Sequence, residues 1–168
     1  LIASTGDYNT GIGYHALNSN TSGISNTAVG KSTLGANTTG THNTAIGIEA
    51  LDANTTGLAN VALGGRALGA NTTANYNTAV GWQALYTNTT GTYNTAMGVN
   101  AMYYSTTGSN NIAIGDTALY ANTTGYWNVA MGYHALENNT TGGNSVAIGY
   151  KALEAATTSG NNTAVGTT

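Results

Sequence analysis

The segment NTAVGWQALYTNTTGTY, from Asn77 to Tyr93, is the unit of construction of this chain, because close copies of it fill all 168 residues. Its fifth residue is a glycine that returns every seventeen residues, without insertion or deletion, at Gly13, Gly30, Gly47, Gly64, Gly81, Gly98, Gly115, Gly132, Gly149 and Gly166. We number each unit from this glycine as position 0. A fixed period is the signature of stacked repeats. The sequence therefore predicts one repeat domain over residues 1–168, made of about ten units.

Each unit alternates large and small residues just before the glycine. Position −1 is always aliphatic, position −2 is Ala except for Gly11, position −3 is Thr, Val or Ile, and position −4 is Asn except for Ser145. Position +4 is Leu, or Met in Met102. This alternation is typical of a short strand, and the glycine and the NTTG stretch are turn signals. Two short strands and two turns per unit predict one coil of an all-β, parallel β-solenoid, with coils stacked about 4.8 Å apart.

The parity of the strand predicts an inside and an outside. A single coil has too few apolar groups to offset the cost of ordering its backbone, so the core must run through the whole stack. We expect the bulky rows at −1 and +4 to form that core. The Ala row at −2 then points the other way, and its small size predicts close approach of a neighbouring chain in a homo-oligomer.

The asparagine rows at −4 and +7 admit two interpretations. Stacked amides could hydrogen-bond to each other and to the turn backbone. Alternatively, the +7 row could carry N-linked glycans, because every NTT is also an N-x-Thr acceptor sequence. The candidate acceptors are Asn37, Asn54, Asn71, Asn88, Asn122 and Asn139.

The cores NTAVG, NTAIG, NIAIG and NSVAIG, the last from Asn144 to Gly149, resemble the head repeats of YadA-type trimeric autotransporter adhesins. The full unit is also similar to repeat tracts in tail-fibre-like surface proteins. The resemblance covers the whole chain, although the adhesin repeat is typically shorter than seventeen residues. It implies a left-handed β-roll, lateral association into a trimer, and a place outside the cell or on a virion surface.

The chain has few charged residues. Charged residues make up 5% of the chain, the net charge is −3, and the three cations, Lys31, Arg66 and Lys151, are too few to bind nucleic acid. No apolar run could span a bilayer, so we expect no membrane insertion. The histidines and carboxylates show no metal-ligand or catalytic spacing, and Glu49 with Asp52 is better explained as solvent-facing variation. We therefore expect no catalytic, cofactor or metal site, and no enzyme.

The aromatic residues fall at variable positions outside the expected core parity. Exposed aromatic rows pack against a neighbouring chain or stack on sugars, and we favour packing. The principal candidates for such surface contacts are Tyr76, Trp82, Tyr93 and Trp127.

These observations favour a structural and adhesive extracellular fibre or filament segment, with a host-surface or glycan ligand. Both ends of the chain fall within repeats, so we expect an uncapped stack that could join copies head to tail. The alternatives are an ice-binding solenoid that presents threonine ladders such as Thr55-Thr56, or a carbohydrate-binding tail-fibre shaft.

Overall fold

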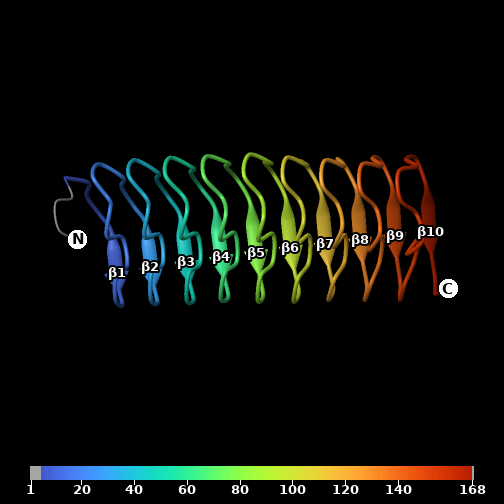
Figure 1. The fold of residues 1–168 in the computed structure, drawn as a ribbon, viewed down its shortest axis with the longest axis horizontal. Helices are drawn as coiled ribbons and strands as arrows, with labels where there is room; N and C mark the ends of the chain where they lie inside the picture. The colour runs from blue at the N-terminus through green and yellow to red at the C-terminus, as the bar shows by residue number, and fades with distance from the viewer. Residues whose placement is uncertain (1–4, 168) are drawn as a thin grey trace.

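The fold is a β-solenoid, seen in a computed structural model that describes residues 5–167. The described chain contains ten strands of three residues each, all parallel and in sequence order within one sheet. Figure 1 shows the coils following one another along the long axis, with the two termini at opposite ends. The strands are β1 (Thr10–Ile12), β2 (Thr27–Val29), β3 (Thr44–Ile46), β4 (Val61–Leu63), β5 (Thr78–Val80), β6 (Thr95–Met97), β7 (Ile112–Ile114), β8 (Val129–Met131), β9 (Val146–Ile148) and β10 (Thr163–Val165).

The register places equal repeat positions on top of each other. In the β5–β6 pair, Ala79 lies opposite Ala96 and Val80 lies opposite Met97, each seventeen residues apart. We call the stack of residues at one repeat position a column. The expectation of two strands per coil is wrong, because each coil has one strand and closes through turns. The turns still bond to the next coil, as in Thr38 N–H to Thr55 O at 2.9 Å. No helix able to cross a membrane occurs within residues 5–167.

The core consists of the +4 column and two columns of small residues. The +4 side chains from Leu17 to Leu136 are fully buried, as predicted. The Ala columns at −2 and +3 line the rest of the apolar interior. A methyl group placed on Gly11, the one glycine at −2, would lie 3.6 Å from Leu17 Cδ1 and 3.8 Å from Ala16 Cβ. The −2 methyl groups therefore pack onto Leu and Ala of their own coil.

The predictions for the −1 and −2 columns are wrong. The aliphatic −1 side chains lie on the outer side of the sheet, where Ile46 is 44% exposed and Val80 is half-buried. The Ala row at −2 does not face a neighbouring chain, because Ala79 and its equivalents are buried inside the coil. The +4 leucines and the buried asparagines already fill the interior, so only a methyl group fits beneath the strand.

Both asparagine columns are buried and hydrogen-bonded, as the stacked-amide interpretation predicts. Asn54 donates from Nδ2 to Asn37 Oδ1 at 2.9 Å and to Gly57 O at 3.1 Å. In the −4 column, Asn26 Oδ1 accepts from Asn43 N–H at 3.0 Å. The six candidate glycan acceptors, Asn37, Asn54, Asn71, Asn88, Asn122 and Asn139, have no more than 1% of their surface exposed. Their amide nitrogens are therefore inaccessible to glycosylation in the folded chain.

The corners of each coil use left-handed backbone at three non-glycine positions, −5, +2 and +4. In one coil these are Tyr76 (φ 60°), Gln83 (φ 55°) and Leu85 (φ 53°). Position 0 has φ values from 129° to 138°, a region that glycine alone adopts readily. These corners turn the chain sharply enough to close a coil in seventeen residues.

Candidate functional site

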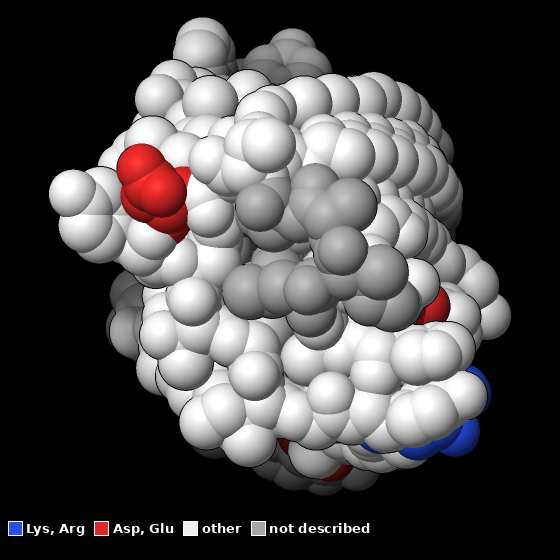
Figure 2. All heavy atoms as spheres, turned by 90° about the vertical axis from the view of Figure 1, so that its left-hand side faces the viewer, with Lys and Arg blue, Asp and Glu red and all other residues white. Residues whose placement is uncertain are grey.

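The outer sheet face is a continuous surface along the rod. We define it as the side chains at −3 and −1 of the ten strands, which carry no Asp, Glu, Lys or Arg. Ile46, Met97, Ile112, Met131 and Ile148 are each between 38% and 44% exposed. Figure 2, an end-on view, shows how few charged atoms the surface carries in that direction. The outer sheet face is thus an uncharged strip with an aliphatic −1 column and threonine at −3 in six of the ten strands.

Exposed aromatic side chains border this strip on both sides. Trp82, at +1, is 47% exposed, while Tyr76, Tyr93 and Trp127, at −5, are 48%, 57% and 60% exposed. The four candidate aromatic contact residues therefore lie on the surface, although the parity argument behind that expectation placed the −1 column on the wrong side of the sheet. Tyr76 and Tyr93 stack on each other, with ring centroids 5.0 Å apart and an angle of 8°. Stacking along the rod covers the ring faces and leaves mainly the ring edges outward.

The threonines of the NTT segments form two columns at +8 and +9. They lie in a bend and not in a strand, and the +9 residues such as Thr56, Thr73 and Thr90 are exposed. The +8 hydroxyl groups are used within the ladder, since Thr55 Oγ1 donates to Thr72 O at 3.1 Å. Within the NTT segments of the central coils, the +9 column presents the more exposed hydroxyl groups, while the −3 threonines of the sheet face, such as Thr44 and Thr78, are half-buried.

A polar band runs along columns +2 and +5. Arg66 Nε donates to Glu49 Oε2 at 2.7 Å, which makes the Glu49 carboxylate part of an ion pair between neighbouring coils. Partial burial, with the charge of Glu49 as a smaller cause, raises the pKa of Asp52. A hollow of about 300 Å³ opens where small residues interrupt the band, lined by His15, Asn18, Ser19, Ser32, Gly35, Ala36, Asp52 and Ala53.

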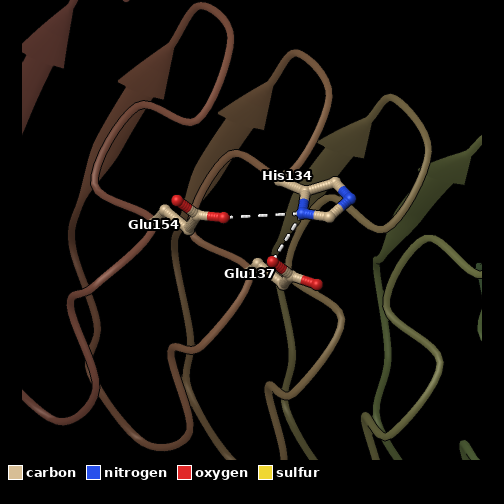
Figure 3. A group of neighbouring side chains, drawn as sticks. All are labelled: His134, Glu137 and Glu154. Atoms are coloured by element: carbon tan, nitrogen blue, oxygen red, sulfur yellow. Dashed lines mark ion pairs between the residues drawn. The ribbon is translucent and has the colours of Figure 1, made fainter. Parts of the chain in front are cut away.

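One cluster in this band brings together residues that the sequence does not pair. His134 Nδ1 lies 2.6 Å from Glu137 Oε2 and 3.5 Å from Glu154 Oε1 (Figure 3). Lys151 Nζ contacts Glu154 Oε1 at 3.0 Å, and this hydrogen bond is the main cause that lowers the pKa of Glu154. Three ligand-type side chains thus meet at one point, although the sequence shows no metal-ligand spacing among them.

The sequence search missed this cluster because it looked for local spacings only. Glu137 follows His134 by three residues, but Glu154 follows by twenty, which is one repeat plus three. In a solenoid a step of one period is a step to the adjacent coil. A search that added seventeen to each familiar ligand spacing would have found the group.

No family model matches this chain, and neither the curated proteins nor the solved structures contain a match to it. Its function must therefore be inferred from its own surfaces.

Proposed function

We propose that this chain is a structural segment of an extracellular fibre, and that copies associate side by side through the outer sheet face. The observation that carries this proposal is the uncharged outer sheet face, on which the −1 side chain is aliphatic in every strand and is exposed or half-buried. Large contiguous apolar patches on soluble proteins are typical of interaction sites. The proposed role is length, rigidity and display, with no catalytic function.

The dimensions of the strip support a second copy as the occupant. Ten strands at about 4.8 Å and three residues at about 3.3 Å each give a strip on the order of 450 Å². A standard interface buries about 800 Å² per partner. The aromatic borders at −5 and +1 widen the strip toward that size, and they would place Trp82 and Tyr93 at the rim of the interface.

The repeat itself favours self-association over a unique partner. Every coil presents the same pair of outward positions at the same spacing, so a copy of this chain is a surface with a matching period. A closed symmetric arrangement of such strips hides the apolar columns from water, as stable homo-oligomers do. A trimer, as in the adhesin heads that the repeats resemble, is the arrangement we favour, and end-to-end continuation of the coils would extend it into a filament.

The test is the mass of the particle in solution. We expect light scattering to give a multiple of the 16.9 kDa chain mass for the unaltered protein. The triple variant Ile46→Lys, Met97→Lys, Met131→Lys should give the monomer mass with its circular dichroism unchanged. The matched control Thr56→Lys, Thr90→Lys, Thr124→Lys adds the same charge to the exposed +9 column and should remain assembled. A monomeric unaltered chain, or an assembled sheet-face variant, would overturn the proposal.

The second candidate is ice binding through the exposed +9 threonine column. It is favoured by the regular spacing of Thr56, Thr73 and Thr90, and opposed by their position in a bend with only one exposed threonine per coil. Measuring the thermal hysteresis of the unaltered chain and of the +9 triple-lysine variant distinguishes ice binding from self-association. Activity that the three lysines abolish would support ice binding.

A further inference from the structure

We propose that His134, Glu137 and Glu154 form a binding site for a divalent cation of the Zn²⁺ class. The site lies on the polar band of the rod, with His134 and Glu137 on one coil and Glu154 on the next (Figure 3). It is independent of the outer sheet face and of the self-association proposed above.

The distances suit a small cation after modest side-chain movement. One ligand atom from each residue lies within 4.8 Å of the other two. Zinc bonds of about 2.0–2.1 Å in tetrahedral geometry separate neighbouring ligand atoms by about 3.3 Å. The His134 Nδ1 to Glu154 Oε1 distance of 3.5 Å already fits. The 2.6 Å contact of Nδ1 with Glu137 Oε2 needs to open by about 0.7 Å.

The imidazole is held with its donor atom toward the carboxylates. Its ring stacks on Tyr133 with centroids 3.8 Å apart, and Figure 3 shows Nε2 pointing away from both glutamates. Nδ1 is buried and faces both carboxylates, 2.6 Å from Glu137 Oε2 and 3.5 Å from Glu154 Oε1. A metal ion between the three groups would replace these two contacts with direct bonds to one cation.

The donor set selects the class of metal. One imidazole nitrogen with two carboxylate oxygens matches the mixed nitrogen and oxygen sites of zinc, whereas calcium and magnesium prefer oxygen ligands alone. Three protein ligands leave a fourth position open to water. The site is expected to bind more weakly than a closed four-ligand structural site.

Lys151 is the internal competitor of the metal. Its ammonium group contacts Glu154 Oε1 at 3.0 Å, on the oxygen that also faces His134. A cation entering the site must displace this contact or share the carboxylate. Removing the ammonium group should therefore tighten metal binding, while removing any ligand should weaken it.

The experiment is a Co²⁺ titration of the tag-free full chain, followed by displacement with Zn²⁺ in a calorimeter. We expect about one equivalent of Co²⁺ with the visible absorption of a low-coordinate site, because three protein ligands leave one open position. His134→Ala and Glu154→Gln should each lower the affinity by about tenfold or more. Lys151→Gln should raise it.

The matched control is His15→Ala. His15 occupies the same position +2 and stacks on Tyr14 at 3.9 Å, but its +5 neighbours are Asn18 and Gly35 in place of two glutamates. This variant should keep full binding. Absence of binding by the unaltered chain, or binding that survives His134→Ala undiminished, would overturn the proposal. Circular dichroism of every variant separates a lost ligand from a lost fold.

Discussion

The glycine at position 0 has two independent reasons to lack a side chain. Gly81 has φ 129°, which L side chains rarely adopt, and a Cβ there would lie 2.5 Å from Gly98 O of the next coil. Gly11 differs on both counts, since its added Cβ meets its nearest neighbour, Ala16 O, at 3.5 Å. The sequence identified position 0 as a turn, but not this contact between coils.

We therefore expect opposite effects from one substitution at two glycines. Gly81→Ala should lower the free energy of unfolding by about 3 kcal/mol or more, because strain and overlap add. Gly11→Ala restores the residue found at −2 in every other unit and should raise it by about 0.4–1 kcal/mol. Thermal melts followed by circular dichroism measure both. Equal destabilisation by the two substitutions would contradict the assigned backbone conformation.

The asparagine ladder at +7 runs from Asn20 to Asn139 and has one internal gap, at Ser105; in the next coil after Asn139 the column ends with Ala156. Asn88 Oδ1 and Ser105 Oγ are buried without a hydrogen-bond partner in the described part of the chain. Asn122 Nδ2 keeps its bond to Gly125 O, at 3.2 Å. The sequence predicted the ladder. The loss of the hydrogen bond to Asn88 Oδ1 at the serine is visible only in the structure, which shows where the neighbouring amides lie.

Ser105→Asn should close this gap and raise the free energy of unfolding by about 1–2 kcal/mol, because a buried unsatisfied acceptor gains a donor. Ser145→Asn in the −4 column is the matched control. Ser145 Oγ already accepts from Asn162 N–H at 3.2 Å, so that substitution should gain less. Melting temperatures of the two variants decide the matter, and a larger gain at position 145 would contradict the ladder account.

At the scale of the strand, the pattern of large and small residues predicted the right element with the wrong face inside. The usual rule that bulky side chains point inward fails because the coil is narrow. Leu85 from the corner occupies the space beneath Ala79, and buried amides fill the rest. The repeats do indicate the correct face. Position −3 is Thr in some units and Val or Ile in others, and a position that accepts both polar and apolar residues is typical of a surface. The +4 column was assigned correctly because it is the one bulky apolar residue of its turn.

The corrected parity makes a quantitative prediction. Leu85→Ala should cost about 2–5 kcal/mol, the range for removing a buried leucine. Val80→Ala, on the outer side of the same coil, should cost less than about 1 kcal/mol in the monomer. Urea titrations of the two variants, made in the monomeric sheet-face background, compare them directly. A cost at position 80 equal to that at position 85 would restore the original assignment of the −1 column to the core.

At the scale of the whole molecule, the features that repeat every seventeen residues can be predicted from the sequence, and the features that depend on single variable positions cannot. The stack of ten coils, the parallel register and the amide ladders follow from the seventeen-residue repeat of residues such as Ala79 and Asn54. The cluster around His134 does not follow from it, because it depends on variable positions that happen to meet across coils. The two functions that we propose, cation binding and self-association, use this variable layer and the outer sheet face.

The most direct test of the central claim is thiol labelling of single-cysteine variants, which the cysteine-free chain permits without background. The claim is that the aliphatic side of the sheet is outside and is covered by other copies. In dilute protein, Val80→Cys should label rapidly, and at high concentration it should become protected. Ala79→Cys should be protected at both concentrations, and Thr90→Cys should label at both. Rapid labelling of Ala79→Cys, or labelling of Val80→Cys that does not change with concentration, would contradict the account.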